Sequence, residues 1–597
     1  MSNSLIRLGR SVRWMLPLAM RGPKSHFSAA DLVEQRARSR GDAVFVRFED
    51  RELTYRDYNR AANRVAHWAL ANELGRGDVV ALIMQNRPEY LEVWAGLAKA
   101  GVTTALANIQ LRGHALAHVL GAAGARHVIL GAECLEAWQS LGEDTPGDVQ
   151  LFVAGDPSTP EPGALPAGAT SLDAATARCD DANPPRSVRA QLLGGDPLFY
   201  IYTSGTTGLP KAARFSHARW LGGGMYALLA GFDRDDVMYC PLPLYHTVAG
   251  VMAVNAVLSA GGTLALARRF RASRFWDDIV AMRATAFQYV GELPRYLLDQ
   301  PERESERRHS IRFCVGNGLR PEVWERFRDR FRIPQIVEFY GATESNVSMV
   351  NLDDRVGSVG KPAVGMQAEL ARYDVARGEH LRDANGLLAL CGTDEVGELI
   401  GRISKGRTVA GTFEGYTSKE ASDKKILRDV KKPGDRWFRS GDLLRRDADG
   451  YYYFVDRIGD TFRWKGENVS TQEVADAVAE FPGVEICAAY GVPVPGADGR
   501  AGMAALRMHD DAVIDGERLY AHVERALPAY ARPAFVRVIE APDITATFKI
   551  RKAGLEREGY DSKAIADRIL YRDDEYRAYL PLSPEVADRI REGRARF

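Results

Sequence analysis

Cysteine is scarce in this chain, with six residues among 597 and no Cys-x-x-Cys pair. Disulfide frameworks and structural zinc sites both depend on closely spaced cysteines. The sequence therefore predicts neither a disulfide-stapled fold nor a zinc-binding fold. Its cysteine content is typical of a reducing compartment such as the cytoplasm.

Net charge is also lacking, because 79 lysine and arginine residues balance 79 aspartate and glutamate residues. Proteins that bind nucleic acid usually carry a clear excess of basic residues. We therefore expect no nucleic-acid partner. Any attraction to an anionic membrane must come from a local basic segment.

Uninterrupted hydrophobic runs are missing as well. Residues 247–267 contain no charged side chain, and the run is long enough to cross a bilayer. Gly250, Gly261 and Gly262 interrupt it, and a glycine pair before Thr-Leu-Ala-Leu is typical of a turn that leads into a core strand. The pattern predicts a buried helix, a turn and a strand instead of a membrane span.

A local basic segment does occur at the N-terminus, where residues 1–26 mix arginines with large apolar side chains. Its apolar centre is too short to span a bilayer, and Pro17 interrupts it. Two hypotheses stay open. The segment attaches peripherally to the inner face of the membrane, or it forms an amphipathic helix docked on the protein.

The length of the chain exceeds what one hydrophobic core normally supports, so we expect two or more domains. Hydrophobic periodicity predicts a helix over 54–74, a strand over 79–84 and a helix over 88–100. This alternation of helix and strand indicates an α/β fold.

A phosphate-binding loop is indicated after a strand pattern at 198–202, which stops abruptly in small hydroxyl residues, glycines and one lysine. The glycines permit positive φ angles, so that successive backbone NH groups can point at an anion. A Walker loop is excluded, because only two residues separate Gly205 from Gly208 and Ala212 follows Lys211. The predicted nucleotide-binding residues of this loop are Thr203, Ser204, Gly205, Thr206, Thr207, Gly208 and Lys211.

This loop resembles that of the adenylate-forming superfamily, which contains acyl-CoA synthetases, luciferases and the adenylation domains of peptide synthetases. The resemblance implies a large N-terminal domain of packed α/β sheets with a barrel-like part, and a small mobile α+β C-terminal domain. We assign these to 27–456 and 457–597. The resemblance also implies that the protein uses ATP, Mg²⁺ and coenzyme A.

A second loop, at 337–344, ends another strand pattern in a hydroxyl residue beside a carboxylate. Because Mg²⁺ keeps most of its waters and takes one or two protein oxygens, Glu344 alone suffices as its ligand. The resemblance implies that Tyr340 stacks on adenine beside Gly341 and that Thr343 contacts a phosphate oxygen. It also places the following backbone against the adenine: Gly316, Asn317 and Gly318.

A third site is centred on Asp442, which follows an aromatic segment. The superfamily uses an aspartate here for the ribose hydroxyls, and a carboxylate that accepts two hydroxyl donors suits a vicinal diol. By the same resemblance, Arg457 contacts the ribose or a phosphate. Gly466 lines the tunnel for the pantetheine arm of coenzyme A.

Residues 456–469 closely resemble the signature of one branch, the fatty-acid transport proteins or very-long-chain acyl-CoA synthetases. They read Asp-Arg-Ile-Gly-Asp-Thr-Phe-Arg-Trp-Lys-Gly-Glu-Asn-Val. Many members of the wider superfamily have a charged hinge residue where this chain has Gly459, and an arginine where it has Asn468. The predicted hinge spans 456–460, and the glycine gives it free φ/ψ rotation without a charged partner.

The segment Thr545–Lys549 resembles the superfamily's catalytic-lysine loop, in which the ammonium bridges the attacking carboxylate and the α-phosphate. Lysine is a flexible point charge suited to two clustered anionic oxygens. Lys552 is a nearby competitor, but Lys549 occupies the motif position after Thr-Phe. The predicted catalytic residues are Lys549, Glu344, Thr343 and His246. For His246 two roles stay open, one in gating the pocket or aiding the thiol step and one as a simple wall residue.

These motifs predict an ATP-dependent long-chain or very-long-chain fatty acid–CoA ligase that forms an acyl-adenylate and releases pyrophosphate and AMP. Three alternatives stay open. The acid could be a steroid side chain, the acceptor could be a carrier protein, or the protein could take up fatty acids with coupled acylation. Neither chain length nor oligomeric state follows from the sequence.

The N-terminal segment yields a first testable prediction. If residues 1–26 attach to membranes, the whole chain should float with liposomes in a density gradient, and residues 27–597 alone should stay at the bottom. Equal behaviour of the two proteins would instead favour a helix docked on the protein.

Overall fold

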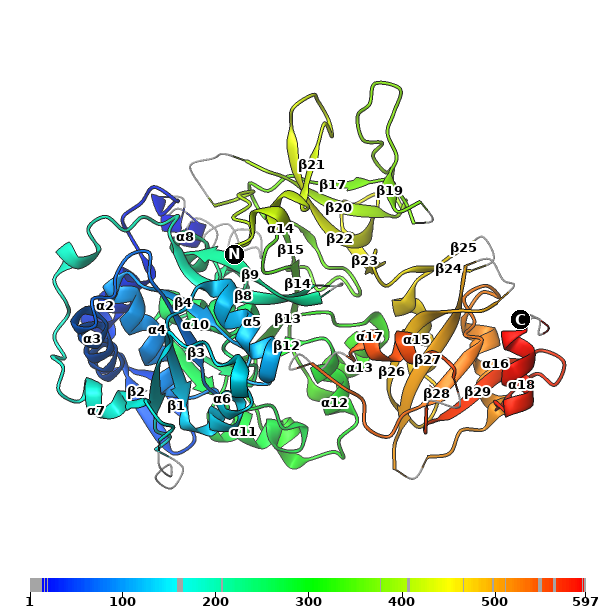
Figure 1. Ribbon diagram of the computed structural model, residues 1–597, viewed down its shortest axis with the longest axis horizontal. Helices are drawn as coiled ribbons and strands as arrows, with labels where there is room; N and C mark the ends of the chain where they lie inside the picture. Colours follow the sequence, from blue (N-terminus) through cyan, green and yellow to red (C-terminus); the bar gives the residue numbers. More distant parts are fainter. Residues whose placement is uncertain are drawn as a thin grey trace. The chain divides into compact units, whose positions relative to one another are not determined.

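The chain forms two compact units in the computed structural model shown in Figure 1. Unit 1 comprises residues 1–367 and 401–426, and unit 2 comprises residues 368–400 and 427–597. Residues 368–400 and 427–456 thus group with the C-terminal residues. The predicted domain boundary after Asp456 assumes that residues 457–597 move as a separate domain. The division into units does not test this movement, so the boundary stays a prediction.

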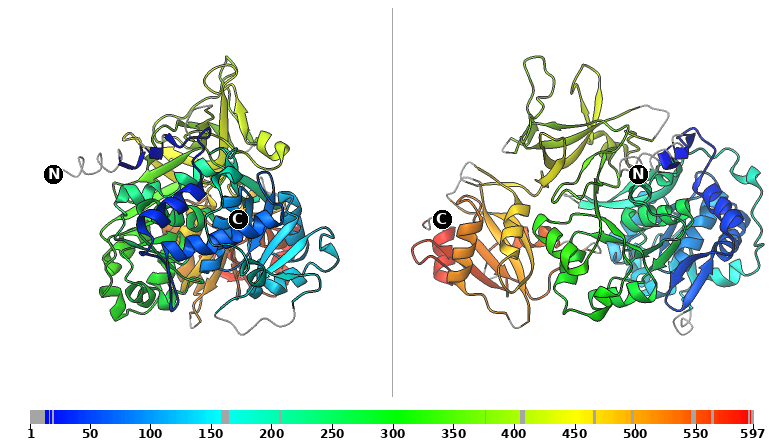
Figure 2. Two further views of the ribbon diagram at one scale, coloured as in Figure 1. Left: turned by 90° about the vertical axis from the view of Figure 1, so that its left-hand side faces the viewer. Right: turned by 180° about the vertical axis from the view of Figure 1, so that it is seen from behind.

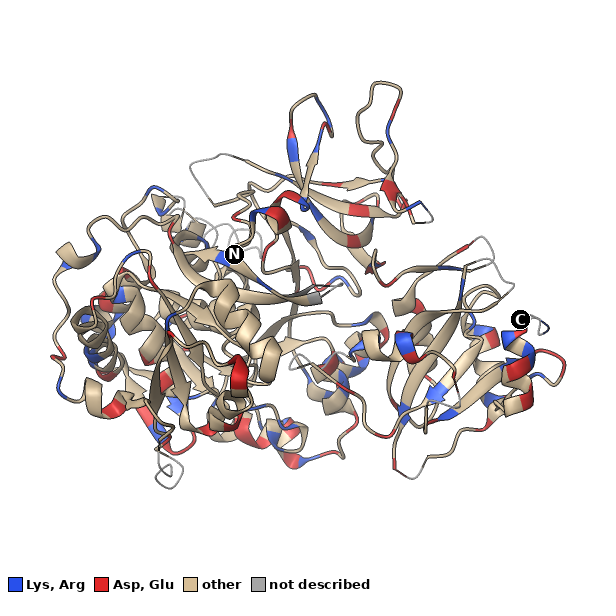
Figure 3. Ribbon diagram, in the orientation of Figure 1, with Lys and Arg blue, Asp and Glu red and all other residues tan. Residues whose placement is uncertain are grey.

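The structure describes most but not all of the sequence, and only the backbone is described at 204, 205 and 208. The described residues are 13–15, 17–18, 20–157, 165–205, 208–375, 377–404, 409–464, 467–495, 499–510, 512–545, 550–561, 565–592 and 594. Figure 3 shows basic and acidic residues interspersed in both units, as their equal numbers suggest.

The larger sheet of unit 1 has nine strands in the order β16-β15-β14-β13-β12-β10-β11-β1-β2. Its central strands pair in parallel and are almost entirely buried, as is usual for a sheet covered on both faces. Antiparallel strands form its two edges. The strands are β1 (Val44–Phe48), β2 (Arg51–Thr54), β10 (Val237–Cys240), β11 (Thr263–Leu266), β12 (Ala286–Val290), β13 (Phe313–Asn317), β14 (Ile336–Gly341), β15 (Ser348–Asn351) and β16 (Lys361–Pro362).

The second sheet of unit 1 has seven strands in the order β7-β6-β5-β3-β4-β8-β9. It ends in the antiparallel hairpin of β8 and β9, the only antiparallel pair among these described strands. The strands are β3 (Val79–Ile83), β4 (Thr103–Leu106), β5 (His127–Gly131), β6 (Gln150–Ala154), β7 (Thr170–Ser171), β8 (Pro197–Gly205) and β9 (Gly208–Ser216).

Helices of unit 1 lie beside these sheets, as Figures 1 and 2 show. The predicted elements at 54–74, 79–84 and 88–100 are confirmed as α3, β3 and α4, and Thr54 starts α3 through a capping box with Asp57. The α-helices are α2 (Ala29–Arg40), α3 (Tyr55–Ala71), α4 (Pro88–Ala100), α5 (Gly113–Ala123), α6 (Leu135–Gln139), α7 (Leu172–Thr176), α8 (His217–Leu221), α9 (Met225–Ala230), α10 (Val254–Ala260), α11 (Phe275–Ala281), α12 (Glu292–Leu298), α13 (Pro321–Phe331) and α14 (Lys419–Asp423).

The charge-free run 247–267 folds as predicted. A π-helix, η4 (Thr247–Ala253), continues into α10, and Gly261 then ends the helix with a φ of +83° before β11 begins. A left-handed residue at this position is a common helix stop, and glycine adopts it without strain. Within the described residues, no helix is both long and apolar enough to cross a membrane.

Unit 2 contains two five-stranded sheets. The first has the order β17-β20-β22-β21, with β23 paired to β22, and the second has the order β26-β27-β28-β29-β30. Helices α15, α16 and α17 contact the second sheet (Figure 2). The elements are β17 (Ala368–Ala371), β18 (Tyr373–Asp374), β19 (Glu379–His380), β20 (Gly397–Arg402), β21 (Ile426–Arg428), β22 (Arg436–Arg446), β23 (Tyr452–Arg457), β24 (Phe462–Trp464), β25 (Glu467–Val469), α15 (Thr471–Ala479), β26 (Val484–Pro493), β27 (Arg500–Met508), α16 (Gly516–Ala526), β28 (Phe535–Val538), α17 (Lys552–Glu558), β29 (Arg568–Asp573), β30 (Ala578–Pro581) and α18 (Pro584–Arg591).

The basic N-terminal segment lies partly outside the described residues, which omit 1–12, 16 and 19. Its C-terminal part runs along unit 1, because the backbone NH groups of Gly194 and Gly195 donate to the carbonyls of Ser25 and Pro23. The proposed membrane attachment of residues 1–26 stays a prediction.

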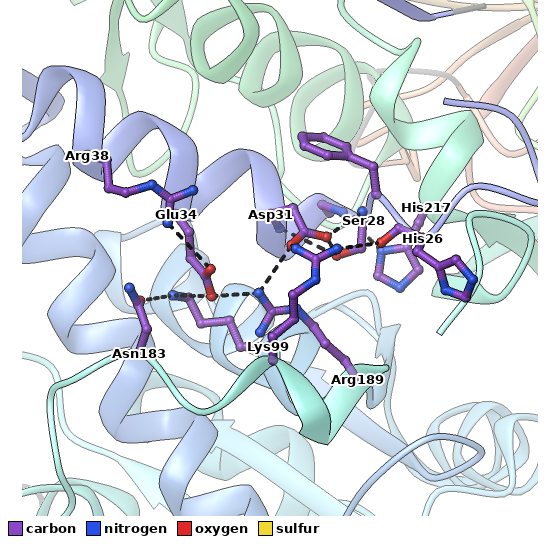
Figure 4. Close-up of polar contacts among 12 residues, drawn as sticks. His26, Ser28, Asp31, Glu34, Arg38, Lys99, Asn183, Arg189 and His217 are labelled. Carbon is purple, nitrogen blue, oxygen red and sulfur yellow. Dashed lines mark hydrogen bonds and ion pairs between the residues drawn. The ribbon is translucent and has the colours of Figure 1, made fainter. Parts of the chain in front are cut away.

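A buried polar cluster joins α2, α3 and α4 to the segment before β8 (Figure 4). Lys99 is completely buried, and its Nζ donates to Asn59, Asn63 and Asn183 and lies 3.5 Å from Glu34. Arg189 reaches the same Glu34 at 2.8 Å and Asp31 at 3.3 Å. Burial lowers the pKa of Lys99 to about 8, although Glu34 opposes this shift.

This cluster predicts a pH-dependent stability difference. Between pH 8 and 10.5 the unfolded chain holds the Lys99 proton more tightly than the folded chain does. The free energy of unfolding should therefore rise with pH relative to Lys99→Met, by about 3 kcal/mol in total. Urea unfolding at several pH values measures the difference. Lys419→Met, at a side chain that is 90% exposed, is the control and should leave the pH dependence unchanged.

Candidate active site

The predicted phosphate loop is the turn of the β8–β9 hairpin. Thr203 pairs with Lys211 and Gly205 with Gly208 across the hairpin, with a register shift between the two pairs. Thr206 and Thr207 lie outside the described residues. Helix α5 supports the hairpin, because Tyr202 Oη donates to the Val119 carbonyl at 2.5 Å.

Residues 415–417 run along the other edge of β9. Ala213 and Tyr416 form an antiparallel bridge, and the backbone NH groups of Arg214 and Thr417 donate to the carbonyls of Gly415 and Ala212. This pairing places the Tyr416 ring 6.0 Å from Lys211 Nζ. Tyr416 is thereby fixed beside the lysine of the phosphate loop.

The same tyrosine contacts the predicted magnesium ligand. Tyr416 Oη donates to Glu344 Oε1 at 3.0 Å, and Lys425 Nζ lies 3.9 Å from that oxygen. Burial, and then Glu344, raise the pKa of Tyr416 well above its ordinary value, so its hydroxyl keeps its proton and serves as a donor. Lys211, Tyr416 and Glu344 thus form one cluster built from three distant segments.

Thr343 and Tyr340 flank this cluster. Thr343 Oγ1 lies 2.8 Å from Thr247 Oγ1, the first residue of η4. Tyr340 is buried near the end of β14, whereas Gly341 is exposed as that strand ends. The predicted loop is therefore held against η4 at its hydroxyl end.

Gly316 and Asn317 end β13, which pairs with β14, and Gly318 follows the strand. A Cβ on Gly316 would lie 2.5 Å from the Tyr289 ring, so only glycine fits there. The buried Glu338 accepts hydrogen bonds from Tyr289 Oη and from the backbone NH groups of Gly318 and Leu319. Burial raises the pKa of Glu338 to about 8. This glutamate, which sequence reasoning missed, sets the turn that follows β13.

Arg219 is another missed residue. It lies in α8, directly after the hairpin, and its Nη2 donates to the Ser345 carbonyl at 2.5 Å and the Ala342 carbonyl at 3.5 Å. These two carbonyls flank Thr343 and Glu344. Two residues after Glu344, the Asn346 side chain donates to the carbonyls of Gly401, Arg402 and Gly411. No local motif marks Arg219, because its partners lie more than 120 residues away in the sequence.

His246 sits just before η4 and against Tyr245, with ring centroids 4.6 Å apart. Its Nε2 is buried and has no hydrogen-bond partner among the described residues. Burial lowers the pKa of His246 to about 4, so the imidazole is neutral near pH 7. Both roles that the sequence left open for His246 stay predictions.

Unit 2 carries the remaining predicted residues. Asp442 and Arg457 face each other on β22 and β23, with Arg457 Nε 3.7 Å from Asp442 Oδ1. Gly466 and Lys549 lie outside the described residues. The ammonium of Lys552 is bound to Asp460 at 3.2 Å and to Thr471 at 2.9 Å within the same unit. These contacts favour a structural role for Lys552 over a catalytic one.

The residues around Glu344 fit a magnesium ion that arrives with a nucleotide. Among the described residues, no group of three or more His, Cys, Asp or Glu side chains could hold a metal alone. Mg²⁺ in nucleotide sites is usually held by one or two carboxylates together with phosphates and water. Glu344, oriented by Tyr416, matches that donor set.

The contacts of Arg219 predict a loss of catalysis without unfolding. Arg219→Met should lower kcat/KM for Mg-ATP by about 10- to 100-fold, because a charged hydrogen bond is worth about 1.5–3 kcal/mol. Pyrophosphate exchange at varied Mg²⁺ measures the effect. Arg214→Met, at an exposed neighbour on β9, is the matched control, and equal activity of the two variants would contradict the role of Arg219.

Comparisons with known proteins identify the family of this chain. The model of the AMP-binding enzyme family matches residues 33–414, and that of the AMP-binding enzyme C-terminal domain matches residues 473–549. The chain is 40% identical to long-chain fatty acid transport protein 2 of Rattus norvegicus, over 93% of this chain and 89% of that protein. It is 39% identical to a medium/long-chain fatty acid–CoA ligase of Mycobacterium tuberculosis, over 96% of this chain and 92% of that protein.

Solved structures share the fold. An anthranilate CoA ligase in complex with anthranoyl-AMP superposes with a TM-score of 0.75 at 22% identity, covering 90% of this chain and 98% of that one. A fatty acyl CoA synthetase of Mycobacterium tuberculosis superposes with a TM-score of 0.62 at 24% identity, covering 90% and 99%. The predicted mixed α/β fold of the adenylate-forming enzymes is confirmed. This chain belongs to the AMP-binding enzyme family, in the branch that contains the long-chain fatty acid transport proteins.

Proposed function

We propose that this protein is an AMP-forming acyl-CoA synthetase that joins a long-chain or very-long-chain fatty acid to coenzyme A. The observation that carries the proposal is the cluster of Lys211, Tyr416 and Glu344 beside a glycine-containing hairpin turn. It is supported by relatives about 40% identical over nearly the whole chain, which are named for fatty acid transport or fatty acid–CoA ligation.

In the first half-reaction a carboxylate oxygen of the fatty acid attacks the α-phosphorus of ATP. The bond between that phosphorus and the bridging oxygen breaks, and pyrophosphate leaves. Such transfers depend on positioning and on stabilising negative charge, and they need no protein nucleophile. Backbone NH groups of the hairpin turn, Lys211 and the Thr343 hydroxyl are suited to bind the phosphates.

Glu344 would hold the magnesium ion, and Tyr416 donates a hydrogen bond to one of its carboxylate oxygens. When bound, Mg²⁺ would supply positive charge that stabilises the departing pyrophosphate. Lys425 Nζ lies 3.9 Å from the same oxygen of Glu344. The contacts of Arg219 with the carbonyls of Ala342 and Ser345 keep this loop at a constant position.

The other residues of the proposed active site belong to unit 2. Asp442 would accept the two ribose hydroxyls, and Arg457, which lies beside it, would contact the ribose or a phosphate. Lys549 would bridge the attacking carboxylate and the α-phosphate. In the second half-reaction the thiol sulfur attacks the acyl carbonyl carbon, the mixed anhydride bond breaks and AMP leaves, with Gly466 leaving room for the pantetheine arm.

A change of conformation between the half-reactions would turn on the segment 456–460. The buried Asp456 anchors one end of it, because its carboxylate accepts hydrogen bonds from the Thr461 hydroxyl and from the backbone NH and hydroxyl of Thr471. Gly459 lies between Asp456 and Thr461 in the sequence, and it has no side chain to restrict backbone rotation. We propose that the rotation occurs at Gly459 and breaks the hydrogen bonds from Thr461 and Thr471 to Asp456, because these partners lie on opposite sides of the glycine.

The proposal predicts unequal loss of the two half-reactions in Lys549→Ala. Pyrophosphate exchange should fall by at least 100-fold, because the group that bridges the two anionic oxygens is removed. Thioester formation from supplied acyl-adenylate should fall less than 10-fold. Lys552→Ala is the comparison variant. If Lys552→Ala lowers pyrophosphate exchange more than Lys549→Ala does, the catalytic role belongs to Lys552.

Acyl specificity is tested by the same exchange reaction with wild-type protein across carboxylates from short to very long chains and steroid side chains. We expect the highest kcat/KM with long or very long chains. Adding coenzyme A or a carrier protein as acceptor then distinguishes a CoA ligase from a carrier-loading enzyme. Fatty acid uptake by cells that survives Lys549→Ala would favour a transport function separate from catalysis.

A further inference from the structure

Glu398, on β20, is a completely buried carboxylate. Its Oε2 accepts a hydrogen bond from His380 Nε2 at 2.6 Å and from Arg439 Nη2 at 3.2 Å. Its Oε1 accepts from Arg439 Nε at 3.2 Å and from the backbone NH of Gly441 at 2.8 Å. Four donors thus surround one carboxylate that no solvent reaches.

These hydrogen bonds hold the backbone that leads to Asp442. Gly441 lies inside β22 and has a φ of +85°, so the strand leaves the extended conformation just before Asp442. The Ser440 hydroxyl donates to the Leu399 carbonyl at 2.7 Å and accepts from the Asp442 NH at 3.0 Å. Two consecutive residues of β20, Glu398 and Leu399, therefore bind three consecutive residues before Asp442.

The charge of Glu398 is retained in this position. Burial alone would raise its pKa, but the hydrogen bond from His380 and the charge of Arg439 outweigh burial, and the pKa of Glu398 is lowered. Glu398 in turn raises the pKa of Arg439 against the effect of burial. The pair therefore stays ionised at neutral pH, which keeps its hydrogen bonds strong.

A buried ion pair of this kind is rarely worth more to stability than apolar packing of the same volume. The Glu398–Arg439 pair instead supplies directional hydrogen bonds, and these fix the position of the backbone before Asp442. The residue so fixed is Asp442, whose side chain is 17% exposed and faces Arg457 across the β22–β23 pair.

We propose that Glu398, together with His380 and Arg439, is a positioning unit that sets Asp442 for the ribose of ATP. This inference rests on the proposed function, in which Asp442 accepts the two ribose hydroxyls. A shift of Asp442 would weaken its hydrogen bonds to the ribose hydroxyls, whereas the residues proposed for the phosphates and the adenine are different ones. Loss of Glu398 should therefore reduce discrimination between ribose and deoxyribose.

The experiment compares ATP with 2′-deoxy-ATP in pyrophosphate exchange. We expect wild-type protein to prefer ATP by at least 10-fold in kcat/KM, and Asp442→Asn to lose most of that preference. Glu398→Gln should lower kcat/KM for ATP by about 10-fold and change that for 2′-deoxy-ATP less than threefold. A purely structural role would lower both values equally.

Asp435→Asn is the matched control. Asp435 lies directly before β22 and accepts hydrogen bonds from the NH groups of Val430 and Lys431 and from the Trp437 indole, and none of these donors is Gly441. It should leave the preference for ATP unchanged. If Glu398→Gln does not fold, His380→Gln, which weakens only one of the four donors, should give a smaller shift in the same direction.

Two results overturn different claims. If Asp442→Asn keeps the full preference for ATP, the proposed role of Asp442 fails, and the inference fails with it. If Asp442→Asn loses the preference but neither Glu398→Gln nor His380→Gln changes it, only the positioning role is wrong.

Discussion

Backbone pairing between β9 and residues 415–417 is the contact on which the site in unit 1 depends. The hairpin provides Lys211 on one edge of this pairing, and the added segment provides Tyr416 on the other. Because these hydrogen bonds join backbone atoms, they set the distance between the two side chains independently of the side chains themselves. Glu344 is then fixed by a hydrogen bond from Tyr416. The loop that carries Glu344 is thereby bonded to the segment that pairs with β9.

Buried polar side chains hold the loops of both units in the same manner. Glu338 accepts backbone NH groups after β13, Asn346 donates to three carbonyls, and Glu398 accepts the NH before Asp442. Loop backbone lacks the regular partners of helices and strands, so each buried NH and carbonyl needs another one. A buried side chain meets this need and also fixes where that stretch of backbone lies. The residues expected to touch the nucleotide are thus supported by residues that do not.

Lys552, near the C-terminus, is held by contacts within unit 2. Lys552 begins α17 and is bound to Asp460 and Thr471, and Thr471 in turn contacts the buried Asp456. These residues connect α17, which closely follows Lys549 in the chain, to the predicted hinge. Arg551 adds a backbone hydrogen bond to the Asp543 carbonyl. Described residues before and after 546–549 are therefore held by contacts within unit 2.

Local sequence patterns were enough to predict the α/β fold, the strands that lead into the hairpin and the second loop, and Glu344 and Asp442 as candidate site residues. These follow from local patterns, because strand and turn propensities and glycine spacing act over a few residues. Only the tertiary structure revealed Tyr416, Arg219, Glu338 and Glu398. Tyr416 and Glu344 are 72 residues apart, and Arg219 and Ser345 are 126 apart. No local pattern records such a contact, since it exists only after the sheets have assembled and brought distant loops to the same edge.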